Sequence, residues 1–201
     1  MKEKEPSSKI TYQKLWREKI MKRKSFDRIA SLLGFGLAVL LLVAASLMNW
    51  GYTFANSQVT DQLTAQKIFF PAAGSPAFSP EKFPEIQKYA GMQLTTGKQA
   101  KAYADKFIAV HLQGIAGGKT YSQVSELSRA NPTDPALAGQ VQTLFRGETI
   151  RGMLGFAFAF WQIGQIAMYG TYACLIGGIL FLILSIMGFI HLRRTPEDAT
   201  V

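Results

Sequence analysis

Few side chains in this 201-residue sequence have the type and spacing that chemistry requires. No CxxC, CxxCH or HExxH pattern occurs and no carboxylates cluster, so metal and c-type haem sites lack support. No serine stands in a nucleophile elbow. The run Gly117-Gly118-Lys119-Thr120 ends like a phosphate loop, but it lacks the earlier glycine and the preceding strand that such a loop needs. We therefore expect a protein that is not an enzyme.

The two histidines are the remaining candidate ligands. His111 falls on the apolar face of a predicted helix, where we interpret it as a core residue. His191 ends a long apolar run, where axial ligation of haem or chlorophyll magnesium is conceivable because neutral imidazole is a common ligand. A polar residue that marks a membrane interface is the simpler interpretation. We expect no metal and no cofactor, and we expect no contact with a pigment or haem, although a structural lipid is compatible with the sequence.

Two long runs contain no Asp, Glu, Lys, Arg or His, from Ile29 to Thr60 and from Gly152 to Ile190. A spanning helix needs about 20 mostly apolar residues to cross ~30 Å of hydrocarbon. We predict an all-α membrane protein: two transmembrane helices with a small extracytoplasmic helical domain between them. The predicted parts are a basic tail with an amphipathic interfacial helix (1–28), the first transmembrane helix (29–54), the extracytoplasmic domain (55–151), a long helix (152–192) that contains the second span at about 170–192, and a short tail (193–201).

The second run is longer than one span requires, since its 39 residues extend roughly 58 Å as one helix. In one interpretation a helix from about Pro135 continues through the run, and only Gly170–Leu192 lies in lipid. In the other, the run is a hairpin of two short spans that turns near Gln162. The hairpin places Arg193 outside, against the positive-inside rule, so we favour the single helix.

Basic residues beside the runs predict the topology. The net charge is +9, and residues 1–28 hold ten Lys or Arg against four acidic residues. By the positive-inside rule both termini are cytoplasmic, in the plasma membrane of a bacterium, with anionic lipids at the cytoplasmic face. We expect no nucleic acid and identify no small-molecule substrate. The predicted membrane-interface residues are Trp16, Arg23, Lys24, Arg28, Trp50, Tyr52, Tyr169, Tyr172, Arg193 and Arg194.

The segment between the runs indicates a helical cluster. Four prolines within 71–84 predict a loop, and helical spacing follows over 100–115, 120–130 and from 135 onward. The boundary signals are a stop at Gly117-Gly118, a capping box from Thr120 to Gln123 and a start at Asp134-Pro135. Because Cys174 is the only cysteine, no disulfide supports this domain, and packing against the spans or a partner must do so.

Small residues and aromatic residues in the runs predict packing against other helices. Small residues at four-residue spacing let helices approach closely, either to pair the two spans or to dock on another membrane protein. If residues 152–168 lie outside the hydrocarbon, their aromatic side chains cannot all face one small cluster, so some are exposed unless another chain covers them. The predicted partner-packing residues are Gly34, Ala38, Phe156, Phe158, Phe160, Trp161, Gly170, Ala173, Gly177 and Gly178.

The pattern Gly97-Lys-Gln-Ala-Lys-Ala-Tyr-Ala, followed by His111 and by Gly117-Gly118-Lys119-Thr120-Tyr121, resembles a group of bacterial two-span membrane proteins of the actinobacterial type. These proteins carry an external helical segment between two spans and have no established activity. The resemblance covers about residues 58–190 and implies topology rather than chemistry.

The sequence as a whole therefore predicts a non-catalytic accessory or assembly subunit of a multisubunit bacterial membrane complex of the respiratory or photosynthetic electron-transfer type. Its partners are then other membrane protein subunits and membrane lipids. The alternative is a free-standing membrane sensor or regulator that binds a ligand in its extracytoplasmic domain.

Overall fold

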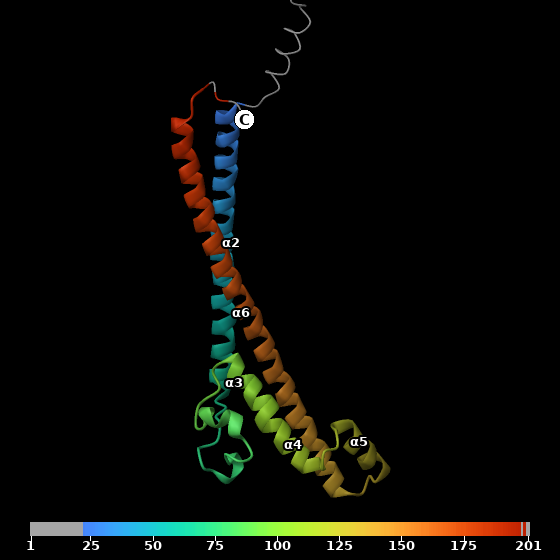
Figure 1. Cartoon of the computed structure of the whole chain (residues 1–201). Coiled ribbons are helices and arrows are strands. Elements are labelled where there is room, and N and C mark those ends of the chain that lie inside the picture. The colour runs from blue at the N-terminus through green and yellow to red at the C-terminus, as the bar shows by residue number, and fades with distance from the viewer. Residues whose placement is uncertain (1–21, 198, 200–201) are drawn as a thin grey trace, which may run out of the picture. The chain divides into compact units, whose positions relative to one another are not determined.

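The computed structural model describes residues 22–197 and 199, which form helices and no β-strand (Figure 1). The predicted interfacial helix around Trp16 lies outside the described residues. Two helices, α2 (Arg23–Gln66) and α6 (Pro135–Arg194), are long and apolar enough to cross a membrane. Over the described residues, the predictions of an all-helical chain and of two long apolar helices are confirmed, and they suggest a membrane location.

Short helices fill the segment between α2 and α6. They are the 3₁₀ helices η1 (Pro76–Phe78) and η2 (Pro84–Tyr89), the helix α3 (Gly97–Ala102), the π-helical segment η3 (Tyr103–Ile108), and the helices α4 (Ala109–Ala116) and α5 (Tyr121–Ala130). An isolated antiparallel bridge joins Phe69 and Gln93.

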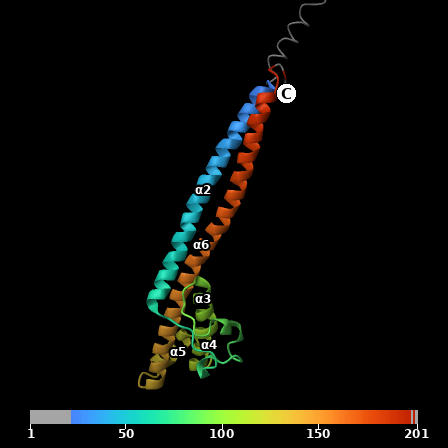
Figure 2. The same cartoon turned by 90° about the vertical axis from the view of Figure 1, so that its left-hand side faces the viewer.

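The chain divides into two compact units. The paired-helix unit comprises the described residues of 1–48 and 169–201, and the helix-cluster unit comprises Asn49–Met168. In the paired-helix unit α2 and α6 lie side by side, as Figures 1 and 2 both show. They run antiparallel, since Ser31 faces Gly188 at one end and Met48 faces Gly170 at the other.

The local signals read from the sequence set the helix boundaries of the helix-cluster unit. Thr120 caps α5 by accepting from the Gln123 N–H, and Asp134 Oδ1 accepts from the Ala136 N–H at 2.8 Å to start α6. Gly117 ends α4 in the left-handed conformation, with φ of 58°. These three boundary predictions are confirmed. Residues 152–190 lie within the one continuous helix α6, with no turn near Gln162.

Aromatic residues of the proline-rich loop build the main core of the helix-cluster unit. Phe70, Phe78 and Phe83 are buried, and the rings of Phe78 and Phe83 stack with centroids 5.6 Å apart. Leu63 from α2 and Leu154 from α6 belong to the same core. The loop over 71–84 is therefore anchored by its aromatic side chains, which the sequence patterns did not reveal.

Gly97 gives the closest approach between α3 and α6. A Cβ on Gly97 would overlap Cβ and Cγ of Trp161, whereas a Cβ on Gly114 in α4 would meet no atom within 4 Å. Gly97 therefore allows the Trp161 indole, 9% exposed, to lie against the start of α3.

We predict that Gly97→Ala lowers the free energy of unfolding of the helix-cluster unit by about 1–3 kcal/mol, because the added methyl forces the indole and α3 apart. Gly114→Ala is the matched control and should leave stability unchanged or raise it by up to ~1 kcal/mol through helix propensity. Thermal unfolding of the full chain in detergent, followed by tryptophan fluorescence, measures both. Equal stability of the two variants would contradict the packing described.

Candidate functional site

A seam of residues with small or compact side chains joins α2 and α6 in the paired-helix unit. A Cβ on Gly178 would lie 3.0 Å from Leu42 Cγ and 3.4 Å from the Ala38 carbonyl oxygen. A Cβ on Gly170 would lie 2.6 Å from Met48 Sδ. Four of the small residues predicted to pack on partners, Gly34, Ala38, Gly170 and Gly178, thus contribute to the contact between the chain's own two helices, and Gly177 adds a looser contact to Leu41.

One end of this seam is polar. A pocket of about 310 Å³ there is lined by Asp27, Ser31, Ser185 and His191 among other residues. Asp27 Oδ2 lies 3.9 Å from His191 Nε2, so the His191 imidazole faces a carboxylate. Ser31 and Ser185 are buried, and the described residues give neither Asp27 Oδ2 nor Ser185 Oγ a hydrogen-bond partner. Lys24 and Glu197 add an ion pair at 3.2 Å.

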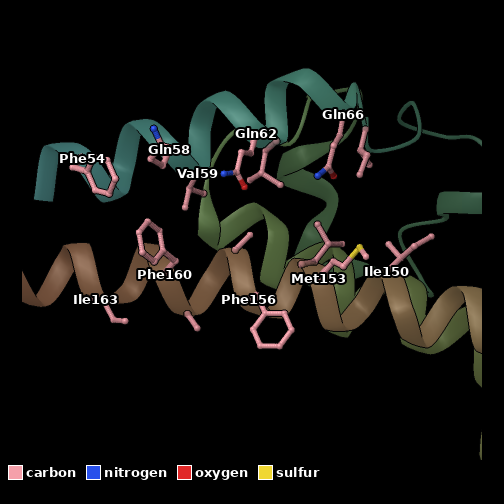
Figure 3. A pocket seen from close by; sticks show the side chains of 15 residues that line it. Phe54, Gln58, Val59, Gln62, Gln66, Ile150, Met153, Phe156, Phe160 and Ile163 are labelled. Atoms are coloured by element: carbon pink, nitrogen blue, oxygen red, sulfur yellow. The ribbon is translucent and has the colours of Figure 1, made fainter. Parts of the chain in front are cut away.

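A larger groove lies in the helix-cluster unit, between the second half of α2 and the middle of α6 (Figure 3). Its volume is about 790 Å³, and no residue that lines it carries a charge. Apolar side chains dominate the lining. They are Phe54, Val59, Leu63, Ile68, Ile150, Met153, Leu154, Phe156, Ala157, Ala159, Phe160 and Ile163.

Three glutamines give the groove a polar edge along α2. Gln58, Gln62 and Gln66 are four residues apart, so their amides follow one face of the helix, as Figure 3 shows. Among the described residues these amides have no hydrogen-bond partner. The groove thus combines an apolar wall from α6 with a row of neutral donors and acceptors, a composition typical of binding sites.

The four aromatic residues predicted to pack on partners divide into two pairs. Trp161 is buried against Gly97, and Phe158 packs against the core, with the Lys101 ammonium 5.1 Å from its ring centroid. Phe156 is 78% exposed and Phe160 lies in the groove facing α2, where its ring meets Phe54 edge-on at 6.4 Å. Phe156 and Phe160 are therefore the pair that the chain itself leaves uncovered.

His111 is held in an aromatic cluster. Its ring is parallel to the Phe83 ring with centroids 5.5 Å apart, and Nδ1 lies 2.9 Å from the Phe107 carbonyl oxygen. Burial raises the pKa of the Tyr103 phenol in the same cluster, which keeps that phenol neutral. This environment fits the interpretation of His111 as a packing residue.

The cluster depends on a π-helical turn that the sequence patterns did not indicate. In η3 the Ala109 N–H donates to the Ala104 carbonyl, five residues back. Arg151 Nε also donates to that carbonyl at 3.2 Å, and Arg151 pairs with Glu148 at 2.8 Å. The arginine next to the second apolar run thereby ties α6 to η3.

The predicted membrane-interface residues that the structure describes lie on the surface or half-buried. Trp50, Tyr169 and Tyr172 are exposed, and the Trp50 ring stacks on Phe54 with centroids 5.7 Å apart. Arg23, Arg28, Arg193 and Arg194 are exposed, whereas Tyr52 and Lys24 are half-buried. Ala173 and Cys174 lie on α6 within the paired-helix unit.

No three His, Cys, Asp or Glu side chains gather in the described part of the chain in a way that could hold a metal ion. Comparisons with protein families, with curated proteins and with solved structures found no match for this chain.

We predict that Gly178→Leu separates α2 from α6 and lowers the free energy of unfolding by about 1–3 kcal/mol, because the seam has no room for a side chain there. Gly36→Leu is the matched control, since a Cβ at Gly36 meets nothing within 4 Å. Thermal unfolding in a mild detergent measures both variants. A loss of stability for Gly36→Leu equal to that for Gly178→Leu would contradict the seam.

Proposed function

We propose that this protein is a non-catalytic accessory or assembly subunit of a multisubunit bacterial membrane complex of the respiratory or photosynthetic electron-transfer type. In this proposal the paired-helix unit crosses the plasma membrane twice, with both termini in the cytoplasm. The helix-cluster unit is the extracytoplasmic part. The electron-transfer type follows from the sequence interpretation alone.

The uncovered groove carries the proposal. The groove and the exposed Phe156 belong to the helix-cluster unit, which in this proposal lies outside the lipid. Water contact with so large an apolar surface is unfavourable, and such patches mark sites where another molecule binds. Because α2 and α6 already pair through their own small residues in the paired-helix unit, we assign contact with a neighbouring polypeptide to the groove.

The charge distribution supports the proposed orientation. Arg23, Arg28, Arg193 and Arg194 lie at the ends of α2 and α6 that the positive-inside rule keeps in the cytoplasm. Trp50 and Tyr169 lie at the opposite ends of the two spans, as expected for an outer aromatic belt. Anionic lipids would then contact the arginines.

The alternative is a free-standing sensor or regulator. The groove volume of about 790 Å³ lies within the range of small-molecule sites, and three amides could orient a ligand there. A sensor predicts ligand binding by the isolated protein, whereas an accessory subunit predicts stable contact with other polypeptides at the groove.

We predict that photoreactive p-benzoylphenylalanine at position 156 cross-links to another polypeptide in native membranes, because Phe156 is the most exposed of the large apolar residues that line the groove. The same amino acid at Phe145, exposed on α6 but outside the groove, is the control and should give at least tenfold less adduct. Mass spectrometry of the adduct identifies the neighbour. Adducts to lipid or ligand alone at position 156 would contradict the accessory-subunit proposal.

The topology gives a separate prediction. Protease added outside sealed cells should cut within the loop 67–96 and leave both ends of the chain intact, because the proposed orientation exposes only the helix-cluster unit. Immunoblots against tags at each end measure the fragments. Trimming of either tag in sealed cells, with the loop protected, would contradict the proposed orientation.

A further inference from the structure

Two exposed side chains of α6 form a ridge beside the groove. Phe156 and Ile163, 78% and 61% exposed, lie on the side of α6 turned away from α2, as Figure 3 shows. Both side chains come from the same stretch of α6, residues 150–163, that lines the groove. The protein therefore presents a ridge and a groove at the same height along one helix.

This matching of height is what a two-fold symmetric pair requires. Two copies inserted in one membrane with the same orientation are related by an axis along the membrane normal, and such an axis allows no shift along the helices. A ridge can fill the other copy's groove only if ridge and groove lie at equal heights. Phe156 and Ile163 meet that condition because α6 supplies both features.

The charge pattern points to the same pairing. The chain carries a net charge of +9, so contact between two copies is favoured where charged side chains are absent. The groove is lined by uncharged residues alone. Apposing two such faces therefore carries no direct charge repulsion, and the amides of Gln58, Gln62 and Gln66 remain at the edge, where water or each other can satisfy them.

The exposed apolar area is at the lower end of what a stable pair buries. Six apolar residues, four in the groove and two on the ridge, are 40–78% exposed, and large side chains of about 150–250 Å² each then offer roughly 600 Å² per chain. A standard stable interface buries about 800 Å² on each partner. Ile166, on the next turn of α6, and the glutamine row supply further contact area.

We propose that the occupant of the groove is a second copy of this chain, with Phe156 and Ile163 of each copy lying against the open side of the other copy's groove. The inference rests on the proposed function for the shared membrane orientation. A single lipid chain could fill the hollow, but it would leave Phe156 exposed and make no hydrogen bond to the glutamines. A different protein and a lipid are the other outcomes of the test.

The first test uses the full-length protein in mild detergent and in lipid nanodiscs. We expect a mass of two chains for the wild type by light scattering. Phe156→Glu should weaken association at least tenfold, because it places a carboxylate in an apolar contact, and Phe145→Glu should associate like the wild type. Circular dichroism checks that each variant keeps its helix content. A monomeric wild type in both media, or equal association of the two variants, would overturn the proposal.

The second test places cysteines across the proposed contact. In a Cys174→Ala background, chains carrying Gln62→Cys and chains carrying Phe156→Cys are co-expressed with different tags. Oxidation should join the two tagged chains. Ser57→Cys, on the other face of α2 by helical spacing, is the control for Gln62→Cys and should join Phe156→Cys at least tenfold less. Equal yields for both pairs would overturn the proposal.

The two proposals can fail separately. If the protein is monomeric but position 156 cross-links to another subunit, the dimer is wrong and the accessory-subunit proposal stands. If the protein forms the cysteine-linked pair and copurifies with no other polypeptide, the dimer stands and the accessory-subunit proposal is wrong.

Discussion

The close approach of α2 and α6 is the constraint on which the rest of the structure depends. In the paired-helix unit glycine, alanine and serine pack against one another and against Leu42 and Met48. In the helix-cluster unit Gly164 lies against Ala55, where a Cβ on the glycine would be 3.0 Å from the alanine Cβ. Helices that meet through small residues bring their backbones together and gain dispersion contacts along their length. The same choice of residues places the large apolar side chains elsewhere, on faces that another molecule must cover.

The helix-cluster unit uses that pair as one wall of its core. Leu63 and Leu154 meet the aromatic side chains of the proline-rich loop, while α3 lies close to α6 because Gly97 leaves room for the indole of Trp161. On the other side of α2 and α6, no described segment of the chain covers the apolar side chains. Phe156 is exposed because it lies on the side of α6 turned away from α2, where no described segment of the chain covers it.

The sequence predicted the parts of this fold that depend on local chemistry. Uncharged length defined the two long helices, and caps such as Thr120 and Asp134 defined the helix boundaries, because each signal acts within a few residues. The burial of Phe78 and Phe83 and the π-turn of η3 escaped prediction, since both depend on contacts between distant segments. Contacts between distant segments also decide which aromatic residues of α6 are covered. Periodicity placed Phe156 and Trp161 on one helix, but the position of Gly97 determines that Trp161 is the covered one. The aromatic run over residues 152–168 predicted an exposed apolar surface, whereas no prediction covered the row of glutamines on α2.

Arg151 has a consequence for how α6 can move. An axial shift of α6 within the helix-cluster unit would have to break a specific hydrogen bond as well as side-chain packing. Arg151 opposes such sliding, because its Nε–H donates to the Ala104 carbonyl in the π-turn, a bond that a shift of one helical turn would break. The widened turn therefore fixes the axial position of α6 relative to η3 within the helix-cluster unit.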